Sequence, residues 1–364
     1  MNRKWLLLLV IVFVIFIGGC GFKDIDKRFF VVSIGVDKGA TKRYKVSVEL
    51  VLPSGDPKAP GDSTIFSEEG DSVAEAIGII KANADKELDF GHMKVIIIGN
   101  EVAKQNLFTT LDWFSRRRDI QEIAWVSLSD STAREILEYH PKGEYIPSNN
   151  LLLLFGNEGT ETPYIISEYL FSFWRDLVEP GIDPVLPIIK YIKEENTLEI
   201  QRSGVIRNKR LSLILDNDDT MLLNLFVKQK VKSEINVKSK KYDFTIASSK
   251  AKVKYKIRTN HQDSPIIDIM VSLKGNLEEK HREHQKVNLN EYEKITNQHY
   301  KKKFESLLKK LQKAKVDPIG FGQRYEATHI GAEDVKIKKW QKLYPKAKFR
   351  VKVTTKIDGT GIIK

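Results

Sequence analysis

The chain contains one cysteine among its 364 residues, and this residue, Cys20, directly follows an apolar segment at the amino terminus. A single cysteine cannot form an internal disulfide, so the fold must be stabilised by its hydrophobic core. A chain of this length allows two or three domains, each large enough to bury such a core. The sequence therefore predicts a globular protein whose one cysteine has a purpose other than cross-linking.

The first residues have the layout of a signal peptide. Arg3 and Lys4 precede an unbroken apolar run over residues 5–17, and two glycines lead from this run to Cys20. A helix that spans a membrane needs about 20 apolar residues, so this run is too short. We expect residues 1–19 to be cut away on export.

The order Ile17-Gly18-Gly19-Cys20 resembles a bacterial lipobox. In a lipobox the cysteine thiolate accepts a diacylglyceryl group, and the peptide is cut just before that cysteine. We expect Cys20 to carry diacylglycerol and an N-acyl chain, which together anchor a protein stably in a membrane. No other cofactor and no metal are expected. The alternative is an uncleaved amino-terminal anchor with a chance cysteine.

The formal net charge is +12, and most of the lysine excess lies in the second half of the chain. A basic chain can bind nucleic acid, lie against an anionic membrane, or simply have a well-solvated surface. Export argues against nucleic acid, and a solvated surface is the simplest explanation. Attraction to anionic headgroups is the second, because each Lys or Arg held near a bilayer contributes about 1 kcal/mol.

Apolar periodicity predicts alternating strands and helices in a first domain, residues 20–195. Capping boxes, Ser72 with Glu75 and Thr132 with Glu135, mark two helix starts. A loop is expected over 53–62, and the prolines of 180–187 close the region. The other expected elements are a hairpin over 29–36 and 44–50, strands over 95–98 and 125–128, and a helix over 102–114. This alternation predicts a mixed sheet.

A small middle domain is expected over residues 196–240, with a hairpin turn at Asn208-Lys209 followed by a helix near 220–228. The third domain, residues 241–364, should contain a long amphipathic helix over 289–315. Its expected strands are 244–246, 251–257, 266–273 and 349–354, and lysines alternate with apolar residues in the second of these. The predicted fold class is α+β: three domains with mixed sheets packed by helices.

Several short segments, in this order and spacing, resemble the C-subunit lipoproteins of bacterial spore germinant receptors, the Ger(x)C family. The resemblance covers nearly the whole chain after Cys20. It departs at Gly21-Phe22-Lys23-Asp24, where the family often has Trp-Asp or Trp-Asn. The segments are Ser33-Ile34-Gly35-Val36-Asp37-Lys38, Tyr44-Lys45-Val46, residues 92–99, Arg117-Arg118-Asp119, residues 133–137, Asp183-Pro184-Val185-Leu186-Pro187, Asp317-Pro318-Ile319-Gly320-Phe321-Gly322, Trp340 and residues 349–359.

The resemblance implies a location and partners. It places the chain on the outer face of the inner spore membrane, beside an integral-membrane A-type subunit and a B-type subunit. One of these subunits resembles an amino-acid transporter and senses the nutrient, so no direct nutrient ligand is expected here. The resemblance also implies a three-domain α+β fold and no enzymatic activity. We accordingly expect a role in nutrient-triggered spore germination.

Few residues suggest chemistry of their own. His281 and His284 lie three apart among carboxylates, but in a polar connector where solvation explains them better than a metal. The Gly320-Phe321-Gly322 segment lacks the third glycine and the following helix of a phosphate loop, so we interpret it as a structural turn. His92 could respond to pH but is better explained as a structural residue at a strand start. No pattern of an enzyme nucleophile and base is present.

Arg116, Arg117 and Arg118 form a basic cluster at the end of the helix expected over 102–114. Favourable placement of cations at a helix carboxyl terminus can explain the cluster without a function. It remains the best candidate in the sequence for a contact with a partner subunit or with lipid headgroups.

Two classes of function compete. The first is an interaction protein, the lipid-tethered receptor subunit described above, in which tethering raises the effective concentration of partners. The alternative is an exported solute-binding lipoprotein that serves a transporter. Such proteins usually have two similar lobes around a cleft, whereas the regions of this chain are dissimilar. A lipoprotein hydrolase is a distant third.

Overall fold

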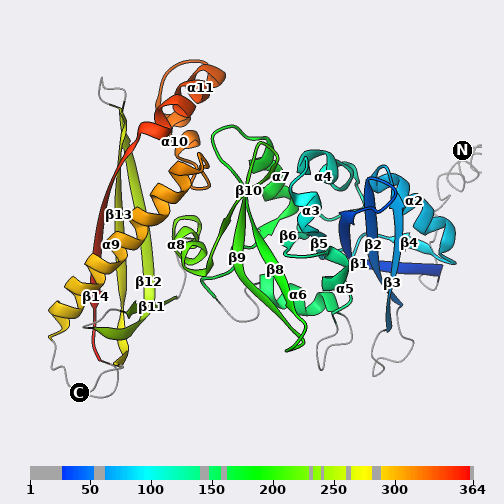
Figure 1. Ribbon diagram of the computed structural model, residues 1–364, viewed down its shortest axis with the longest axis horizontal. Helices are drawn as coiled ribbons and strands as arrows, with labels where there is room; N and C mark the ends of the chain where they lie inside the picture. Colours follow the sequence, from blue (N-terminus) through cyan, green and yellow to red (C-terminus); the bar gives the residue numbers. More distant parts are fainter. Residues whose placement is uncertain are drawn as a thin grey trace, which may run out of the picture.

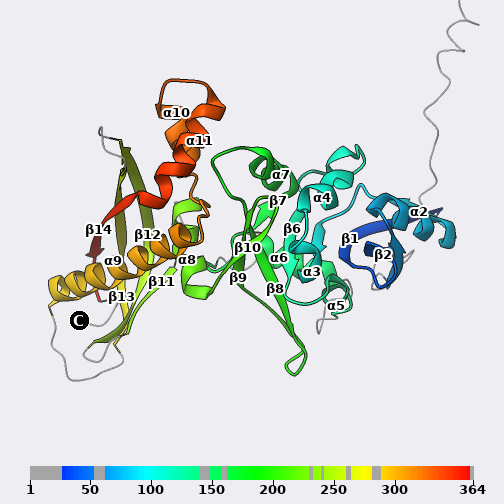
Figure 2. The same cartoon turned by 45° about the horizontal axis from the view of Figure 1, so that its top comes forward.

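The computed structural model describes residues 27–52, 62–139, 147–156, 162–228, 233–238, 242–259, 264–280 and 288–360. The expected signal peptide, Cys20, His281 and His284 lie outside the described residues. The described chain forms two β-sheets with helices packed on them, one toward each end of an elongated molecule (Figures 1 and 2).

The first sheet has ten strands and is parallel at its centre, because β1, β5, β6 and β8 pair in parallel while the hairpins at both ends are antiparallel. Its main order is β10-β9-β8-β6-β5-β1-β2-β3, with β4 beside β1 and β7 beside β6. The strands are β1 (Arg28–Lys38), β2 (Tyr44–Leu52), β3 (Asp62–Gly70), β4 (Glu87–Asp89), β5 (Val95–Ile98), β6 (Trp125–Ser129), β7 (Glu168–Tyr169), β8 (Val185–Ile192), β9 (Thr197–Arg207) and β10 (Arg210–Leu215).

Helices cover both faces of the central strands. In β5, Ile96 and Ile98 enter one hydrophobic cluster and Val95 and Ile97 the other, which explains why this strand is apolar throughout. The first cluster includes residues of α2 (Val73–Asn83), α3 (Asn100–Ala103), α4 (Leu107–Arg116) and α7 (Leu170–Val178). The second includes α5 (Ala133–Leu137) and α6 (Pro147–Phe155).

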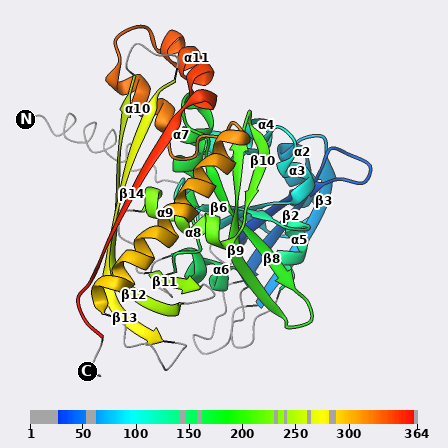
Figure 3. The same cartoon turned by 60° about the vertical axis from the view of Figure 1, so that its left-hand side comes forward.

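The second sheet has four strands in the order β11-β12-β13-β14, and only β13 and β14 pair in parallel. The strands are β11 (Ser233–Lys238), β12 (Asp243–Arg258), β13 (Ile266–Lys280) and β14 (Lys348–Ile357). The long helix α9 (Leu289–Lys313) packs along one face of the sheet (Figure 3). Along the chain, α9 is followed by α10 (Phe321–Thr328), α11 (Glu333–Leu343) and a 3-10 turn (Tyr344–Lys346), and then by β14.

The predicted fold class is confirmed, including the mixed sheets and the long helix in the carboxyl-terminal part. Both predicted N-caps form: Ser72 Oγ accepts from Glu75 N at 3.1 Å, and Thr132 Oγ1 accepts from Glu135 N at 3.2 Å, while the Glu75 carboxylate accepts from Asp71 N, one residue before the cap. Strand β8 was not expected, because the prolines of residues 180–187 marked the close of the first domain, and proline is rare in central strands. Tertiary pairing overrides that signal, since Pro187 is accommodated opposite Ser203 of β9.

The expected boundary near residue 195 lies in the turn between β8 and β9, which pair with each other. Strands β9 and β10 complete the first sheet, whereas β11 belongs to the second. Between them, α8 (Asn217–Val227) lies against β9 and α9. Residues 196–240 therefore contribute to both sheets instead of forming a sheet of their own. The three-domain division stays a prediction.

Candidate functional site

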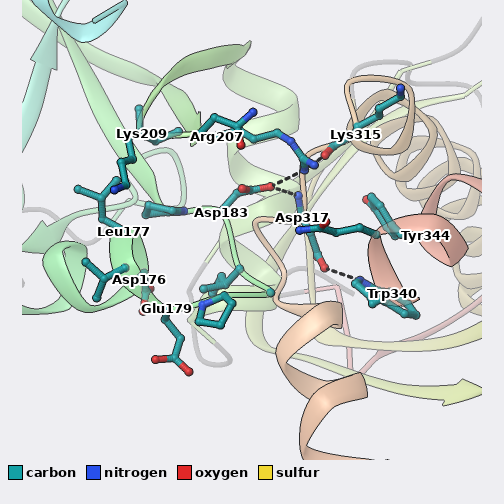
Figure 4. A pocket seen from close by; sticks show the side chains of 18 of the residues that line it. Asp176, Leu177, Glu179, Asp183, Arg207, Lys209, Lys315, Asp317, Trp340 and Tyr344 are labelled. Carbon is teal, nitrogen blue, oxygen red and sulfur yellow. Dashed lines mark hydrogen bonds and ion pairs between the residues drawn. The ribbon is translucent and has the colours of Figure 1, made fainter. Parts of the chain in front are cut away.

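The two sheets meet at a polar joint built from two Asp-Pro pairs that are far apart in sequence. Asp183 stands just before β8 of the first sheet, and Asp317 stands in the turn between α9 and α10 (Figure 4). Arg207, at the end of β9, and Trp340, on α11, complete the joint. The sequence contained one signal for this joint, because each Asp-Pro pair lies close to glycines. Nothing in the sequence indicated that the two pairs meet.

Asp317 caps helix α10 from inside the protein. Its carboxylate accepts the backbone N–H of Phe321 at 3.0 Å and that of Gly322 at 2.8 Å. The indole Nε1 of Trp340 donates to the same carboxylate at 3.3 Å. The residue is only 6% exposed, so these three donors supply its hydrogen bonds in the absence of bulk water.

Asp183 connects the first sheet to this turn. Its carboxylate accepts the backbone N–H of Asp317 at 2.6 Å, and its own N–H donates to the Asp317 carbonyl at 3.1 Å. The Arg207 guanidinium lies 3.3 Å from the Asp183 carboxylate and also donates to the carbonyl of Lys315. Two hydrogen bonds between Asp183 and Asp317 and one cation therefore join the two sheets, beside the hydrophobic cluster that both sheets share.

Glycines allow the close approach of the two chain segments. Gly181 has a φ of +89°, and a Cβ there would lie 2.7 Å from the backbone N of Gln323. A Cβ on Gly322 would lie 2.7 Å from the carbonyl O of Gly181. Gly320, with a φ of +75°, precedes α10 in the left-handed conformation that favours glycine.

Burial makes both carboxyl groups harder to ionise. Desolvation raises the pKa of Asp317 to about 7, against the opposing effect of its N–H donors, and the neighbouring Asp183 adds to the increase. Desolvation also raises the pKa of Asp183, and its backbone hydrogen bond and Arg207 oppose this effect. The joint is therefore a place where protonation and the docking of the two sheets are coupled.

A cleft of about 280 Å³ opens beside the joint and is lined by both halves of the chain, including Glu179, Lys209 and Gln341. Because the Asp317 oxygens accept N–H groups of their own chain, they are poorly placed to serve as a catalytic acid or base. The joint of Asp183 and Asp317 can position the two sheets relative to each other, and the geometry supports this structural role.

A second buried carboxylate connects three of the segments that carry the family resemblance. Asp37, at the end of β1, accepts the backbone N–H of Ala133 at 2.7 Å and of Arg134 at 2.9 Å. A Cβ on Gly99 would lie 2.0 Å from its Oδ1. Burial raises the pKa of Asp37, and the two N–H donors oppose this effect. These segments therefore anchor the amino terminus of α5 in the first sheet.

Carboxylates hold two of the three arginines of the predicted contact cluster. Arg116 pairs with Asp112 at 2.7 Å, one helical turn earlier, and this pair raises the Arg116 pKa. Arg117 pairs with Asp119, and its guanidinium lies 4.6 Å from the ring centre of Phe90. Arg118 is exposed. Arg117 thus has a structural role, while Arg118 is the member best placed for a contact.

Two other sequence interpretations can be compared with the structure. The expectation that no helix follows Gly320-Phe321-Gly322 is wrong, because α10 begins at Phe321. The interpretation as a structural turn nevertheless holds, since the first amides of α10 donate to Asp317 instead of facing solvent. His92 is exposed and contacts the edge of Phe30, with ring centres 4.9 Å apart.

Two kinds of feature are absent from the described residues. They contain no group of three or more His, Cys, Asp or Glu side chains able to hold a metal ion. No helix among them is both long enough and apolar enough to cross a membrane.

Family comparisons match both halves of the chain. The model described as "Spore germination protein N-terminal domain" matches residues 21–191. The model described as "Spore germination B3/ GerAC like, C-terminal" matches residues 201–361. Together they cover nearly everything after the expected cleavage site.

Full-length relatives and a solved structure agree with the matches of the two family models. The chain is 24% identical to spore germination protein GerQC of Bacillus cereus, over 99% of each chain. It is 24% identical to spore germination protein KC of Bacillus subtilis (strain 168), over 100% of this chain and 97% of that protein. The crystal structure of the GerBC protein matches with a TM-score of 0.60 at 19% identity, over 89% of this chain and 96% of that chain.

The two joined sheets define a class of protein, a two-part α+β scaffold whose halves meet at a buried polar joint. The chain belongs to the Ger(x)C family of spore germination proteins. The descriptions of the matching family models and the names of the relatives refer to spore germination and state no catalytic activity.

Proposed function

We propose that this protein is the lipid-anchored C subunit of a nutrient germinant receptor. It would be attached through Cys20 to the outer face of the inner spore membrane and act with integral-membrane A-type and B-type subunits. The observation that carries the proposal is the match of both family models, in order, to a chain that begins with a signal-peptide pattern ending at Cys20.

The structure supports a positioning role. The joint of Asp183, Asp317 and Arg207 holds two dissimilar halves together, as a subunit that bridges partners requires. Lipid attachment would hold this scaffold beside the membrane subunits, so that weak protein contacts form at a high effective concentration.

The test is germination of spores in which Cys20→Ala replaces the native residue. Dipicolinic acid release is measured across a panel of nutrients, with calcium dipicolinate as a trigger that bypasses receptors. We expect a lost response to some nutrients and an intact control response. Normal germination in spores shown to lack the lipid would contradict the proposal.

The solute-binding alternative is less well supported. A ten-stranded mixed sheet and a four-stranded sheet with one long helix are not two similar lobes. A thermal-shift screen with amino acids and sugars separates the two functions, because a ligand that binds only the folded state raises the melting temperature. A large, saturable shift with one solute would favour the alternative.

We also propose Arg118 as a contact with a partner subunit. Arg118→Glu reverses an exposed charge without breaking the ion pairs of Arg116 and Arg117. We expect weaker co-purification of the membrane subunits than with the control Lys190→Glu, which reverses the charge of an exposed residue of β8. Unchanged co-purification would remove Arg118 from the interface.

A further inference from the structure

One face of the four-stranded sheet is covered and the other is open. The buried residues of β12, β13 and β14 form a single hydrophobic cluster with α9, including Val253, Ile269 and Val351 against Phe304. The alternate residues of the same three strands are mostly exposed. This open side is therefore lined by regularly alternating side chains of three neighbouring strands.

The open side is almost entirely of one charge. On β12, every second residue from Lys250 to Arg258 is Lys or Arg, and all of them are exposed. On β14, alternate positions from Lys348 to Lys356 carry Lys, Arg, Lys, Thr and Lys. Over residues 266–274, which pair with both of these strands, β13 adds Lys274 and one carboxylate, Asp268; Glu278 is exposed farther along the same strand. We call this set of alternate positions the basic face.

Few of these cations are neutralised. Within the described residues, only Arg258, which pairs with Asp268, and Lys274, which lies 3.2 Å from Asp358, have a carboxylate at ion-pair distance. From the strand spacing and rise, the face covers roughly 500 Å². Such a dense field of one sign attracts anions over a Debye length of about 10 Å.

The register places like charges directly opposite one another. Lys250 is paired with Lys274, and Lys274 with Lys356, so three lysines form one row across three strands. Like charges directly opposite in a sheet are destabilising, and soluble proteins usually intersperse the two signs. An anionic partner on this face would relieve the repulsion.

The composition of the face favours a lipid surface over a protein. Its cations are mainly lysines, which are depleted in protein interfaces and act as point charges on flexible stems. No aromatic residue lies on it, although aromatic residues anchor most protein partners. Near its centre Met270 is 51% exposed, a flexible apolar side chain between Lys254 and Lys352. These features suit a fluid layer of headgroups above an apolar interior.

We propose that the basic face docks on the anionic headgroups of a lipid bilayer. The proposal rests on the membrane attachment proposed above, since an anchored chain is held beside such headgroups. It adds a second contact, so that both the amino terminus and the second sheet would face the same membrane.

The experiment uses an unlipidated chain that starts at residue 21 and therefore keeps every described residue. Sedimentation is measured with phosphatidylcholine vesicles and with vesicles in which a third of the lipid is phosphatidylglycerol. The test variant carries Lys252→Gln, Lys254→Gln, Lys352→Gln and Lys356→Gln. The matched control carries Lys294→Gln, Lys302→Gln, Lys309→Gln and Lys313→Gln, which remove the same charge from exposed positions of α9.

We expect the unchanged chain and the control to sediment with anionic vesicles only, and less at high salt. Each lysine near a bilayer contributes a factor of about five, so the test variant should lose on the order of a hundred-fold or more in affinity. Circular dichroism checks that both variants are folded, and neutral side chains at exposed positions should not prevent folding.

Two results would overturn the proposal: no binding of the unchanged chain to anionic vesicles, or equal binding of the test and control variants. Binding to polyglutamate without binding to vesicles would assign the face to an acidic protein instead. Because the lipid on Cys20 is absent from this assay, its outcome is independent of the germination test of Cys20→Ala.

Discussion

Replacing Asp317 by asparagine tests whether burial or hydrogen bonding decides the protonation state of Asp317, and with it the stability of the joint between the two sheets. The carboxylate has three N–H donors, from Phe321, Gly322 and Trp340. An asparagine oxygen can keep two of them, but its amide group then faces the third donor. At a pH where the wild-type carboxyl is protonated, we expect Asp317→Asn to cost about 1–3 kcal/mol, the penalty for one unsatisfied buried donor.

The loss of stability caused by Asp317→Asn should decrease as the pH rises. The folded pKa of Asp317 is about 7, whereas an unfolded aspartate has a pKa of about 3.9. The folded protein therefore retains a proton that the unfolded chain releases, so the wild type loses stability as pH rises through the folded pKa. The whole shift corresponds to about 4 kcal/mol, of which about 3 kcal/mol falls between about pH 5 and pH 8. Asparagine does not titrate, so the variant lacks this loss.

The assay is urea unfolding followed by tryptophan fluorescence, at several pH values across that range. The variant should be less stable than the wild type near pH 5 and about equally stable near pH 8. As a control, Asp112→Asn changes a partly exposed carboxylate and should differ from the wild type by less than about 1 kcal/mol throughout. A cost for Asp317→Asn that grows toward pH 8 would refute the reasoning, because the N–H donors would then hold the carboxylate ionised.

Two further predictions concern close packing and capping, and thermal unfolding checks both. Gly181→Ala should lower stability by about 2 kcal/mol or more, because its φ is +89° and the new Cβ would lie 2.7 Å from the backbone N of Gln323. Gly78→Ala, in the open flank of α2, should instead raise stability by about 0.5–1 kcal/mol; a similar effect at both glycines would contradict the packing argument. Asp37→Ala should lower stability by about 1–2 kcal/mol through loss of the α5 cap, whereas the exposed control Glu138→Ala should cost about 0.5 kcal/mol or less. A result for Asp37→Ala no larger than the control would mean that water replaces the cap.

The local elements followed from the sequence because short-range physics decides them. Capping boxes at Ser72 and Thr132 set helix starts, and the apolar stripe of residues 289–315 set the long helix. Alternation of lysines with apolar residues already gave the strand orientation in β12, with one face buried and one exposed. These signals lie within a few residues of the structure they specify.

Long-range pairing was beyond the reach of such signals. The prolines near β8 hid a central strand, because only its neighbours β6 and β9 stabilise the extended chain there. The meeting of Asp183 with Asp317, 134 positions apart, depends on how the two sheets pack, and so do the pKa shifts that burial causes. Likewise, no short-range signal indicated that Arg117 is held by Asp119 while Arg118 is exposed.

Local patterns were enough to identify the order of segments of a Ger(x)C protein, a leading signal-peptide pattern and an excess of lysine in the second half of the chain. The packing of the folded chain gathers these lysines on one face, since parallel pairing of β13 with β14 places Ile266 opposite Lys348, 82 positions later in the chain. It also decided that the two Asp-Pro turns form one joint. Both outcomes depend on contacts between distant segments, and their geometry is set by the packing of whole sheets rather than by local preference.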